Sequence, residues 1–377
     1  MLIGVPAETE PAETRVAATP ETVKKFVSLG AEPAVERGAG LKAGVPDADY
    51  AAAGARLVDA GEALGAEVVL KVRRPTPSEL PSLKNGALVV AIMDPYEHLD
   101  AVEAIARTGV AAFAMELMPR ITRAQVMDVL SSQANLAGYR AVIDAAAEYG
   151  RALPMMMTPA GTVTAARLFV MGVGVAGLQA IATARRLGAV VTATDVRPAT
   201  KEQVESLGAK FVAVEDEEFK QAETAGGYAK EMSDAYKAKQ AELIASHIAK
   251  QDIVVTTALI PGRPAPRLVT ADMVRSMRAG SVIVDLAVER GGNCELAQAG
   301  ETVVTDNGVR IVGYSNVTRL AATASALYAR NLYAFVETMI DKNAKALAVN
   351  WDDELVKATC LTRDGAVVNP NFQPKYA

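Results

Sequence analysis

Three glycines between an apolar stretch and an expected helix are spaced as a phosphate-binding turn requires. Residues 168–177 read LFVMGVGVAG, and a helix is expected over Leu178–Leu187. In this pattern the first glycine permits a tight turn, the second lets the backbone approach a pyrophosphate, and the third lets the helix lie close to the strand. The helix N-terminus then faces the phosphates. The predicted nucleotide contacts in this turn are Gly172, Gly174, Val175, Ala176 and Gly177.

A carboxylate follows at the distance where the adenosine ribose of a dinucleotide would lie. The strand-like VVTATD at 190–195 ends in Asp195, about 20 residues beyond the glycines. Asp195 would accept hydrogen bonds from both ribose hydroxyls and repel a 2′-phosphate, which favours NAD over NADP. Val196 and Arg197 complete this predicted contact, and the charge of Arg197 tempers the preference. A glycine-rich turn in an unrelated α/β protein is the alternative, and the joint presence of strand, spacing and acid argues against it.

The elements that must position these residues alternate between short apolar runs and helical stretches, which predicts parallel α/β sheets. In the first portion of the chain, strands are expected at Leu2–Val5, Val68–Val72, Ala87–Ile92 and Val110–Met115, and helices at Thr19–Gly30 and Asp47–Ala60. In the second portion, strands are expected at Leu168–Met171, Val190–Asp195, Lys210–Val214, Ile253–Thr256, Ser281–Leu286 and Arg310–Val312.

Two long Ala-rich segments, Ile121–Glu148 and Arg319–Asp341, read as helices that connect the two portions and pack together. The tail after them has strand-like pieces at Ala346–Asn350 and Val367–Asn369, and we assign it to the first domain. The expected fold is α/β, with two Rossmann-like doubly wound domains joined by long helices. Residues 1–130 plus 318–377 would form a discontinuous N-terminal domain, and residues 131–317 the Rossmann NAD(H)-binding domain.

Composition excludes several other classes of protein. The chain has 377 residues, half of them hydrophobic, and a net charge of −5 from interleaved acids and bases, so nucleic acid is a poor candidate partner. Cys294 and Cys360 lack any metal-binding spacing, so no metal site is expected. The strand-like start MLIGVP predicts no signal peptide. The longest apolar runs fall short of the roughly 20 residues that cross a bilayer.

Four further stretches are too specific to be generic. They are MELMPRITRAQVMDVLSSQANLAGYR at 115–140, PMMMTPAG at 154–161, AGGYAKEM at 225–232 and TTALIPG at 256–262. Together they closely resemble the NAD(H)-binding domain I of proton-translocating transhydrogenases. The resemblance spans essentially the whole chain, from ETRVA at 13–17 to TRDGA at 362–366.

The resemblance implies a role for a constellation of polar residues. Arg120, Gln125, Asp128 and Ser131 would lie beside the nicotinamide and orient its carboxamide, which hydride transfer requires. Spacing alone favours ordinary solvent-facing residues on an amphipathic helix, and the resemblance reverses that preference. Gly227 and Tyr228 would belong to a mobile loop that closes over the nucleotide, although an exposed surface loop is the plain alternative. Ala258 and Leu259 would pass under the adenosine.

The resemblance also implies the reaction and the partners. NADH on this chain would pass a hydride directly to NADP⁺ on an NADP(H)-binding partner subunit, with the Si/Re stereospecificity of the family. A membrane-spanning subunit would couple this transfer to proton translocation. The chain would be cytoplasmic and peripheral on the inner face of the cytoplasmic membrane. A hairpin formed by Met155–Met157 and the residues that follow, exchanged between two copies, would make a homodimer, although methionines more often fill cores.

Alanine dehydrogenase is the main alternative, because it shares the glycine pattern, the TRVA at 14–17 and a lysine equivalent to Lys71. Its chemistry needs an acid/base histidine, but the chain reads IMDPY at 92–96, with His98 four residues off, and has Glu289 where an aspartate is expected. Arg15 and Lys71 would then be relics that bind nothing, or structural charges paired with nearby acids, and we favour the first interpretation. A nucleotide-sensing module without chemistry is a third class, and it has no need for the residues from Arg120 to Ser131.

Overall fold

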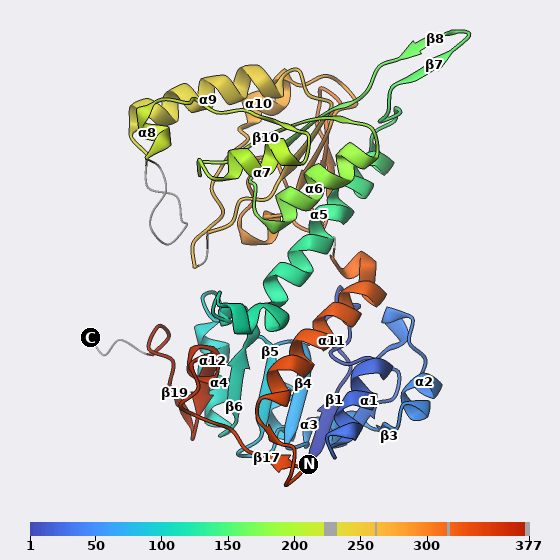
Figure 1. Ribbon diagram of the computed structural model, residues 1–377, viewed down its shortest axis with the longest axis vertical. Coiled ribbons are helices and arrows are strands. Elements are labelled where there is room, and N and C mark those ends of the chain that lie inside the picture. The colour runs from blue at the N-terminus through green and yellow to red at the C-terminus, as the bar shows by residue number, and fades with distance from the viewer. Residues whose placement is uncertain (222–231, 261, 315–316, 374–377) are drawn as a thin grey trace. The chain divides into compact units, whose positions relative to one another are not determined.

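The computed structural model describes residues 1–221, 232–260, 262–314 and 317–373. Contacts divide the chain into two compact units, Met1–Gln133 with Thr318–Ala377, and Ala134–Val317 (Figure 1). Each unit is built around a mostly parallel sheet, which confirms the expected α/β fold class. Among the described residues, no helix is long and apolar enough to span a bilayer.

The sheet of the first unit has eight strands in the order β19-β18-β6-β5-β4-β1-β2-β3. Their bounds are β1 Leu2–Val5, β2 Glu32–Glu36, β3 Arg56–Val58, β4 Val68–Arg73, β5 Leu88–Ile92, β6 Ala111–Ala114, β18 Cys360–Arg363 and β19 Ala366–Val367. Strands β1 to β6 are parallel and follow the doubly wound order 3-2-1-4-5-6. The tail adds the antiparallel pair β18 and β19 at the β6 edge.

Helices cover both faces of this sheet, because its central strands are apolar on both sides. They are α1 Pro20–Ser28, α2 Asp47–Ala52, α3 Ala60–Leu64, α4 Leu99–Arg107, α11 Ala321–Glu337 and α12 Glu354–Thr359. Leu70 of β4 packs in one core cluster with Phe26 of α1 and Phe335 of α11. The adjacent Val69 points to the opposite face and packs with Ile105 of α4, as the period of two along a strand requires.

The sheet of the second unit has seven strands in the order β11-β10-β9-β12-β13-β15-β14. Their bounds are β9 Arg167–Met171, β10 Val190–Thr194, β11 Lys210–Phe211, β12 Ile253–Thr256, β13 Val282–Asp285, β14 Thr302–Val304 and β15 Arg310–Val312. All are parallel except β14. Because the strand order reverses between β9 and β12, a crevice for a ligand is expected at the carboxyl ends of these two strands.

The helices of the second unit are α6 Val175–Arg186, α7 Thr200–Ser206, α8 Glu217–Lys220, α9 Asp234–Ile248 and α10 Ala271–Ser276, with the later portion of α5 Val129–Glu148. Leu168 of β9 packs in one core cluster with Ile181 of α6. Phe169 packs on the other face with Ile248 of α9. The hairpin of β7 Met156–Thr158 and β8 Gly161–Val163 projects from its unit (Figure 1), and its side chains are exposed.

Several expected elements are wrong in extent. The helix expected over Asp47–Ala60 ends at Ala52, because Gly54 has a φ of +97° and the chain then forms the edge strand β3. The segment Ile121–Glu148 is not one helix: a 3-10 helix at Thr122–Met127 is separated from α5 by extended backbone at Asp128.

Two further expectations in the last portion of the chain need correction. The expected helix Arg319–Asp341 ends at Glu337, and the following Ile340–Asp341 pairs as strand β16 with β17 Ala346–Leu347. Strands β2 and β18 are absent from the sequence-based expectation. Both have few of the β-branched and aromatic residues that favour strands, and pairing with the neighbouring strands of the sheet determines their conformation.

Candidate functional site

The glycine turn joins β9 to α6 as the pattern predicts. Gly172 has a φ of +103°, which a residue with a side chain rarely adopts, and its carbonyl accepts a hydrogen bond from the Thr257 hydroxyl at 2.9 Å. A Cβ on Gly177 would lie 1.9 Å from the Gly172 carbonyl oxygen, so no larger residue fits there. Both glycines therefore have the roles that the sequence assigns to them.

Gly174 is the N-cap of α6, and the space beside its Cα is empty. A Cβ at Gly174 would meet nothing within 4 Å, and Gly174 caps α6 without a side-chain hydrogen bond. The first N–H groups of α6 are thus left for another acceptor, and an anion fits their partial positive charge. The turn fits the pyrophosphate of a dinucleotide. A bound NADH would supply the hydride at C4 of its nicotinamide.

A further glycine, Gly138, supports this turn, and sequence reasoning did not identify it. It lies on α5, and a Cβ there would be 2.0 Å from the carbonyl oxygen of Ala176. The glycine lets α5 approach the first turn of α6 closely. Its place as the only glycine in an otherwise Ala-rich segment was the available sequence signal.

Asp195 follows β10 and lies against the glycine turn. One carboxylate oxygen accepts the Val173 backbone N–H at 2.8 Å, and the other accepts the Arg197 backbone N–H at 2.9 Å. The Arg197 guanidinium spans both oxygens, from Nε at 2.9 Å and from a terminal nitrogen at 3.0 Å. The structure therefore brings Asp195 to the turn, and it pairs the acid with Arg197.

The loop after β12 lies beside Gly172 and carries Ala258 and Leu259. Asn293, a buried side chain, accepts the Ala258 N–H at 3.0 Å and donates to the Ala258 carbonyl at 2.9 Å and to the Pro266 carbonyl at 2.8 Å. Sequence reasoning missed Asn293 and the bracing role of Thr257. Nothing in the residue types separates a structural asparagine from an exposed one.

Exposed apolar side chains line the same edge of the sheet. Leu259 is 53% exposed, Val196 45% and Val175 40%. Apolar surface of this kind beside convergent polar groups is typical of a ligand site. The predicted contacts Gly227 and Tyr228 lie outside the described residues.

The other predicted constellation lies in the first unit, at the start of α5. Asp128 accepts the Ser131 backbone N–H at 2.9 Å and the Ser131 hydroxyl at 2.5 Å, which is the hydrogen bonding of a helix N-cap. Arg120 and Gln125 are exposed. The structure thus brings Asp128 and Ser131 together and leaves Arg120 and Gln125 facing solvent within this unit.

Two other residues hold this segment in place, and the sequence did not single them out. The Asn331 amide of α11 donates to the Val126 carbonyl at 2.8 Å and accepts the Ser132 hydroxyl at 2.7 Å. The Arg123 guanidinium binds the Asp353 carboxylate through two hydrogen bonds of 2.7 and 2.9 Å. The backbone around Gln125 and Asp128 is therefore anchored on α11 and at the N-terminus of α12.

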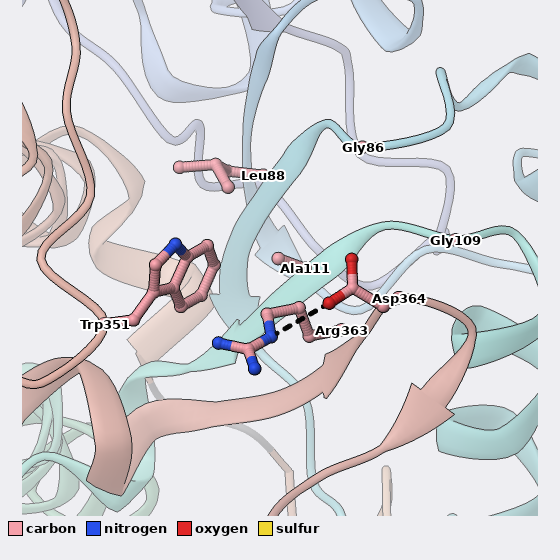
Figure 2. Close-up of a pocket in the computed structure, with 7 residues that line it drawn as sticks. All are labelled: Gly86, Leu88, Gly109, Ala111, Trp351, Arg363 and Asp364. Carbon is pink, nitrogen blue, oxygen red and sulfur yellow. Dashed lines mark ion pairs between the residues drawn. The ribbon is translucent and has the colours of Figure 1, made fainter.

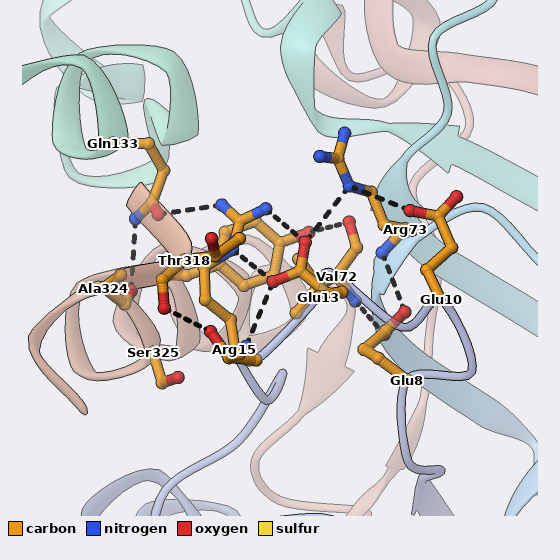
Figure 3. Close-up of polar contacts among 12 residues, drawn as sticks. Glu8, Glu10, Glu13, Arg15, Val72, Arg73, Gln133, Thr318, Ala324 and Ser325 are labelled. Carbon is orange, nitrogen blue, oxygen red and sulfur yellow. Dashed lines mark hydrogen bonds and ion pairs between the residues drawn. The ribbon is translucent and has the colours of Figure 1, made fainter. Parts of the chain in front are cut away.

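A buried charge cluster lies at the carboxyl edge of the first sheet, where the strand order reverses between β1 and β4 (Figure 3). The Glu13 carboxylate binds the Arg15 guanidinium at 2.7 and 2.6 Å and Arg73 at 3.1 Å. Burial opposes ionisation of Glu13, but the Arg15 hydrogen bonds and charge hold its pKa below the ordinary value. Arg15 also donates to the Gln133 side chain at 2.9 Å.

Lys71 is paired in the same way. Its ammonium lies 2.9 Å from a Glu79 oxygen and 3.5 Å from a Glu8 oxygen, and its side chain is 1% exposed. Burial raises the pKa of the Glu8 carboxyl. Arg15 and Lys71 are thus structural charges, each neutralised by acids of this chain, and this favours the second of the two interpretations of these residues.

Glu116 lies at the same edge of the first sheet. One oxygen accepts the Met93 and Asp94 backbone N–H groups at 2.8 and 2.5 Å, and the other is buried without a hydrogen-bond partner. Burial raises its pKa to about 7. The neighbouring Asp94 has a φ of +49° and pairs with Arg73 at 3.6 Å.

Neither histidine joins the charge cluster or the glycine turn in the described portion of the chain. His98 precedes the first residue of α4, so it is the cap of that helix and not a residue on its face. His247 of α9 lies 2.9 Å from the Thr192 hydroxyl and contacts the edge of Phe169, and burial lowers its pKa. A protonated imidazole is disfavoured there, which indicates a structural role for His247.

A cavity of about 360 Å³ lies at the opposite, amino-terminal edge of the first sheet (Figure 2). Leu88 and Ala111, the first residues of β5 and β6, line it with Trp351, Arg363 and Asp364. The Arg363 guanidinium lies 4.7 Å from the centre of the Trp351 ring and its Nε is 3.2 Å from Asp364. This cavity contains none of the residues that the sequence predicts for the site.

Comparisons with known proteins agree with these features. Residues 4–137 match the family described as "Alanine dehydrogenase/PNT, N-terminal domain", and residues 141–370 match "Alanine dehydrogenase/PNT, C-terminal domain". A subunit alpha chain of the NAD(P) transhydrogenase of Rhodospirillum rubrum is 56% identical over 98% of both chains. A crystal structure of transhydrogenase from Sinorhizobium meliloti, 62% identical, superposes with a TM-score of 0.90 over 98% of this chain and 100% of that one. The alanine dehydrogenase of Bacillus subtilis is 30% identical over 78% of this chain and 72% of its own.

Proposed function

The chain belongs to the alanine dehydrogenase/PNT family, and we propose that within this family it is the NAD(H)-binding component of an NAD(P) transhydrogenase. The observation that carries this proposal is the 56% identity to the Rhodospirillum rubrum subunit alpha chain over 98% of both chains, joined to a complete glycine turn and Asp195 in the second unit. The reaction is direct hydride transfer between NADH on this chain and NADP⁺ on a partner subunit.

Four polar residues orient the nicotinamide in this proposal. Arg120 and Gln125 are exposed donors or acceptors, and Asp128 and Ser131 form a preorganised cap at the start of α5. A hydride moves without a proton gained or lost by a side chain, so the reaction needs groups that hold the ring and no acid/base histidine. The positions of His98 as a helix cap and of His247 beside Thr192 are consistent with this assignment.

The partners follow from the chemistry and from what the chain contains. We expect an NADP(H)-binding subunit, because the glycine turn at Gly172–Gly177 provides for one dinucleotide. A membrane-spanning subunit would couple transfer to proton movement, so this chain would sit at the cytoplasmic face of the membrane through its partners. The stereospecificity would be that of Si/Re transhydrogenation. The exposed β7–β8 hairpin, with Met157 81% exposed, is the expected contact between two copies in a homodimer.

A mixing assay tests the proposal. The chain is combined with the acetylpyridine analogue of NAD⁺ and with the separate NADP-binding component loaded with NADPH, and reduction of the analogue is followed by absorbance. We expect reduction only when both proteins are present. The same chain is assayed alone with NAD⁺ and L-alanine, or with NADH, pyruvate and ammonium. Turnover in this second arm, with none in the first, would contradict the proposal and establish a dehydrogenase.

The alternative of an alanine dehydrogenase-like enzyme rests on the retention of Arg15 and Lys71. Such an enzyme would use cations of this kind to hold the carboxylate of its substrate. Here Glu13 binds Arg15 at 2.7 and 2.6 Å, and Glu79 binds Lys71 at 2.9 Å. A substrate carboxylate would have to compete with these buried acids, which disfavours this alternative.

A further inference from the structure

Groups of this chain occupy every hydrogen-bond acceptor position of the Asp195 carboxylate. Each carboxylate oxygen offers about two acceptor positions. One oxygen accepts the Val173 N–H at 2.8 Å and a terminal Arg197 nitrogen at 3.0 Å. The other accepts the Arg197 backbone N–H and the Arg197 Nε, both at 2.9 Å. All four positions are taken by groups of this chain, and the carboxylate is 8% exposed.

This saturation conflicts with direct binding of a ribose. The two hydroxyls of an adenosine ribose are held by an acid at this position through two hydrogen bonds, which need two acceptor positions. The Val173 N–H belongs to the glycine turn, and the Arg197 N–H belongs to the backbone that follows β10. The two side-chain contacts come from a guanidinium that is 30% exposed and has solvent to move into.

We propose that the Arg197 guanidinium competes with the adenosine ribose of NAD(H) for the Asp195 carboxylate, so that nucleotide binding displaces this side chain. The proposal rests on the proposed function, because it takes Asp195 as the ribose-binding acid. The displaced guanidinium gives up the two bonds to Asp195 and its 3.1 Å bond to the Val173 carbonyl. The ribose hydroxyls replace the first two, and the carboxylate keeps its two backbone donors. Binding therefore exchanges one set of hydrogen bonds for another.

The same side chain then bears on the choice between NAD(H) and NADP(H). A guanidinium released from Asp195 stays two residues from the ribose-binding acid, where it is placed to pair with a 2′-phosphate through two hydrogen bonds. Arg197 thus weakens the binding of NADH, because it occupies the Asp195 acceptor positions that the ribose needs. It strengthens the binding of NADPH, because it neutralises the 2′-phosphate. These two effects have opposite signs for the two nucleotides.

Titration of variants with NADH and NADPH, followed by nucleotide fluorescence, tests the proposal. Arg197→Ala should bind NADH about 3- to 10-fold more tightly than the unmodified chain, because the competing state is gone. The same variant should bind NADPH more weakly. Arg197→Gln, which retains polarity without charge, should shift both affinities in the same directions. It provides a second measurement if the alanine variant folds poorly.

Lys201→Ala is the matched control. Lys201 pairs with Glu215 at 2.8 and 2.6 Å, is also partly exposed and lies four residues from Arg197. Neither nucleotide affinity should change in this variant. If both Arg197→Ala and Arg197→Gln bind NADH as well as NADPH more weakly, then Arg197 is a ribose contact or a structural residue. That result would contradict the proposed competition. If the unmodified chain binds no NADH, the proposed function is wrong, and the competition, which rests on it, is wrong as well.

Discussion

The side-chain amide of Asn293 lies edge to edge with the backbone of Ala258. Its oxygen accepts the Ala258 N–H at 3.0 Å, and its nitrogen donates to the Ala258 carbonyl at 2.9 Å. The two hydrogen bonds are like those that a residue of a neighbouring β-strand would make with Ala258. The Thr257 hydroxyl, one residue earlier, bonds the Gly172 carbonyl at 2.9 Å. The loop after β12 and the glycine turn are therefore held by two side chains that need not touch a nucleotide.

Asn293→Ala should lower NADH affinity about 10-fold by releasing the Ala258–Leu259 loop. The variant also leaves buried backbone groups unpaired, at a cost of about 1–3 kcal/mol in the free energy of unfolding. Asn369→Ala is the control, since Asn369 is another buried asparagine that bonds the backbone, at 3.2 Å to the Ala358 carbonyl. Calorimetry should show both variants destabilised and only Asn293→Ala impaired in binding. Equal NADH affinities in the two variants would contradict a role of Asn293 in positioning the loop.

Gln125→Asn and Asp128→Asn should lower the rate of hydride transfer on the order of 10²-fold, because they misplace donors and acceptors around the nicotinamide. NADH affinity should change far less, since most of it comes from the pyrophosphate, ribose and adenine contacts. Stopped-flow measurements in the reconstituted complex give the rate, and fluorescence titration gives the affinity.

The control for the cap is Asp59→Asn. Asp59 caps α3 and accepts the Glu62 N–H at 2.9 Å, as Asp128 caps α5. Asparagine caps helices about as well as aspartate, so neither variant should unfold. An unchanged transfer rate together with collapsed NADH binding in Asp128→Asn would make Asp128 a binding or folding determinant instead.

Glu116 should make the first unit less stable as pH rises from about 4.5 to about 7. Burial raises its pKa from 4.5 to about 7, so in that window the folded state holds a proton that the unfolded state has lost. The contribution is complete below pH 4.5 and is lost progressively up to pH 7, on the order of 3 kcal/mol in all.

Glu116→Gln should abolish this component of the pH dependence, because the amide stays neutral. Thermal unfolding from pH 4.5 to 8 should show the variant more stable than the unmodified chain at pH 8 and similar to it at pH 4.5. Glu103→Gln, an exposed position on α4, should leave the pH profile unchanged. Parallel profiles for the Glu116 variant and the unmodified chain would contradict the raised pKa.

Met157→Asp should dissociate the proposed homodimer, because a charge would be buried where an apolar side chain packs. Met157 is 81% exposed in strand β7 of the exposed hairpin. Leu41→Asp, at a side chain 62% exposed in the first unit, is the control and should leave association unchanged. Sedimentation velocity at micromolar concentration measures the state. An unmodified chain that sediments only as a monomer would end this proposal.

The local patterns of the chain were enough to predict the glycine turn and most of the strands that flank it. The glycines at 172, 174 and 177 act through backbone geometry and close approach, which sequence spacing determines directly. The strands of the parallel sheets are buried on both faces, so they read as continuous apolar runs. Strand β2 and the edge strand β3 lack that signal, and the chain there is extended because neighbouring strands pair with it.

Only the tertiary structure decided which polar groups meet. Asn293 lies 35 residues from Ala258 along the chain, and Asn331 lies 205 residues from Val126, so no local pattern could pair them. The same holds for the acids that neutralise Lys71, and for the saturation of Asp195 by the side chain two residues on. Residue types predicted an acid beside a ribose and two cations near a sheet edge. Whether those charges were available depended on hydrogen bonds that form only once the strands are in register.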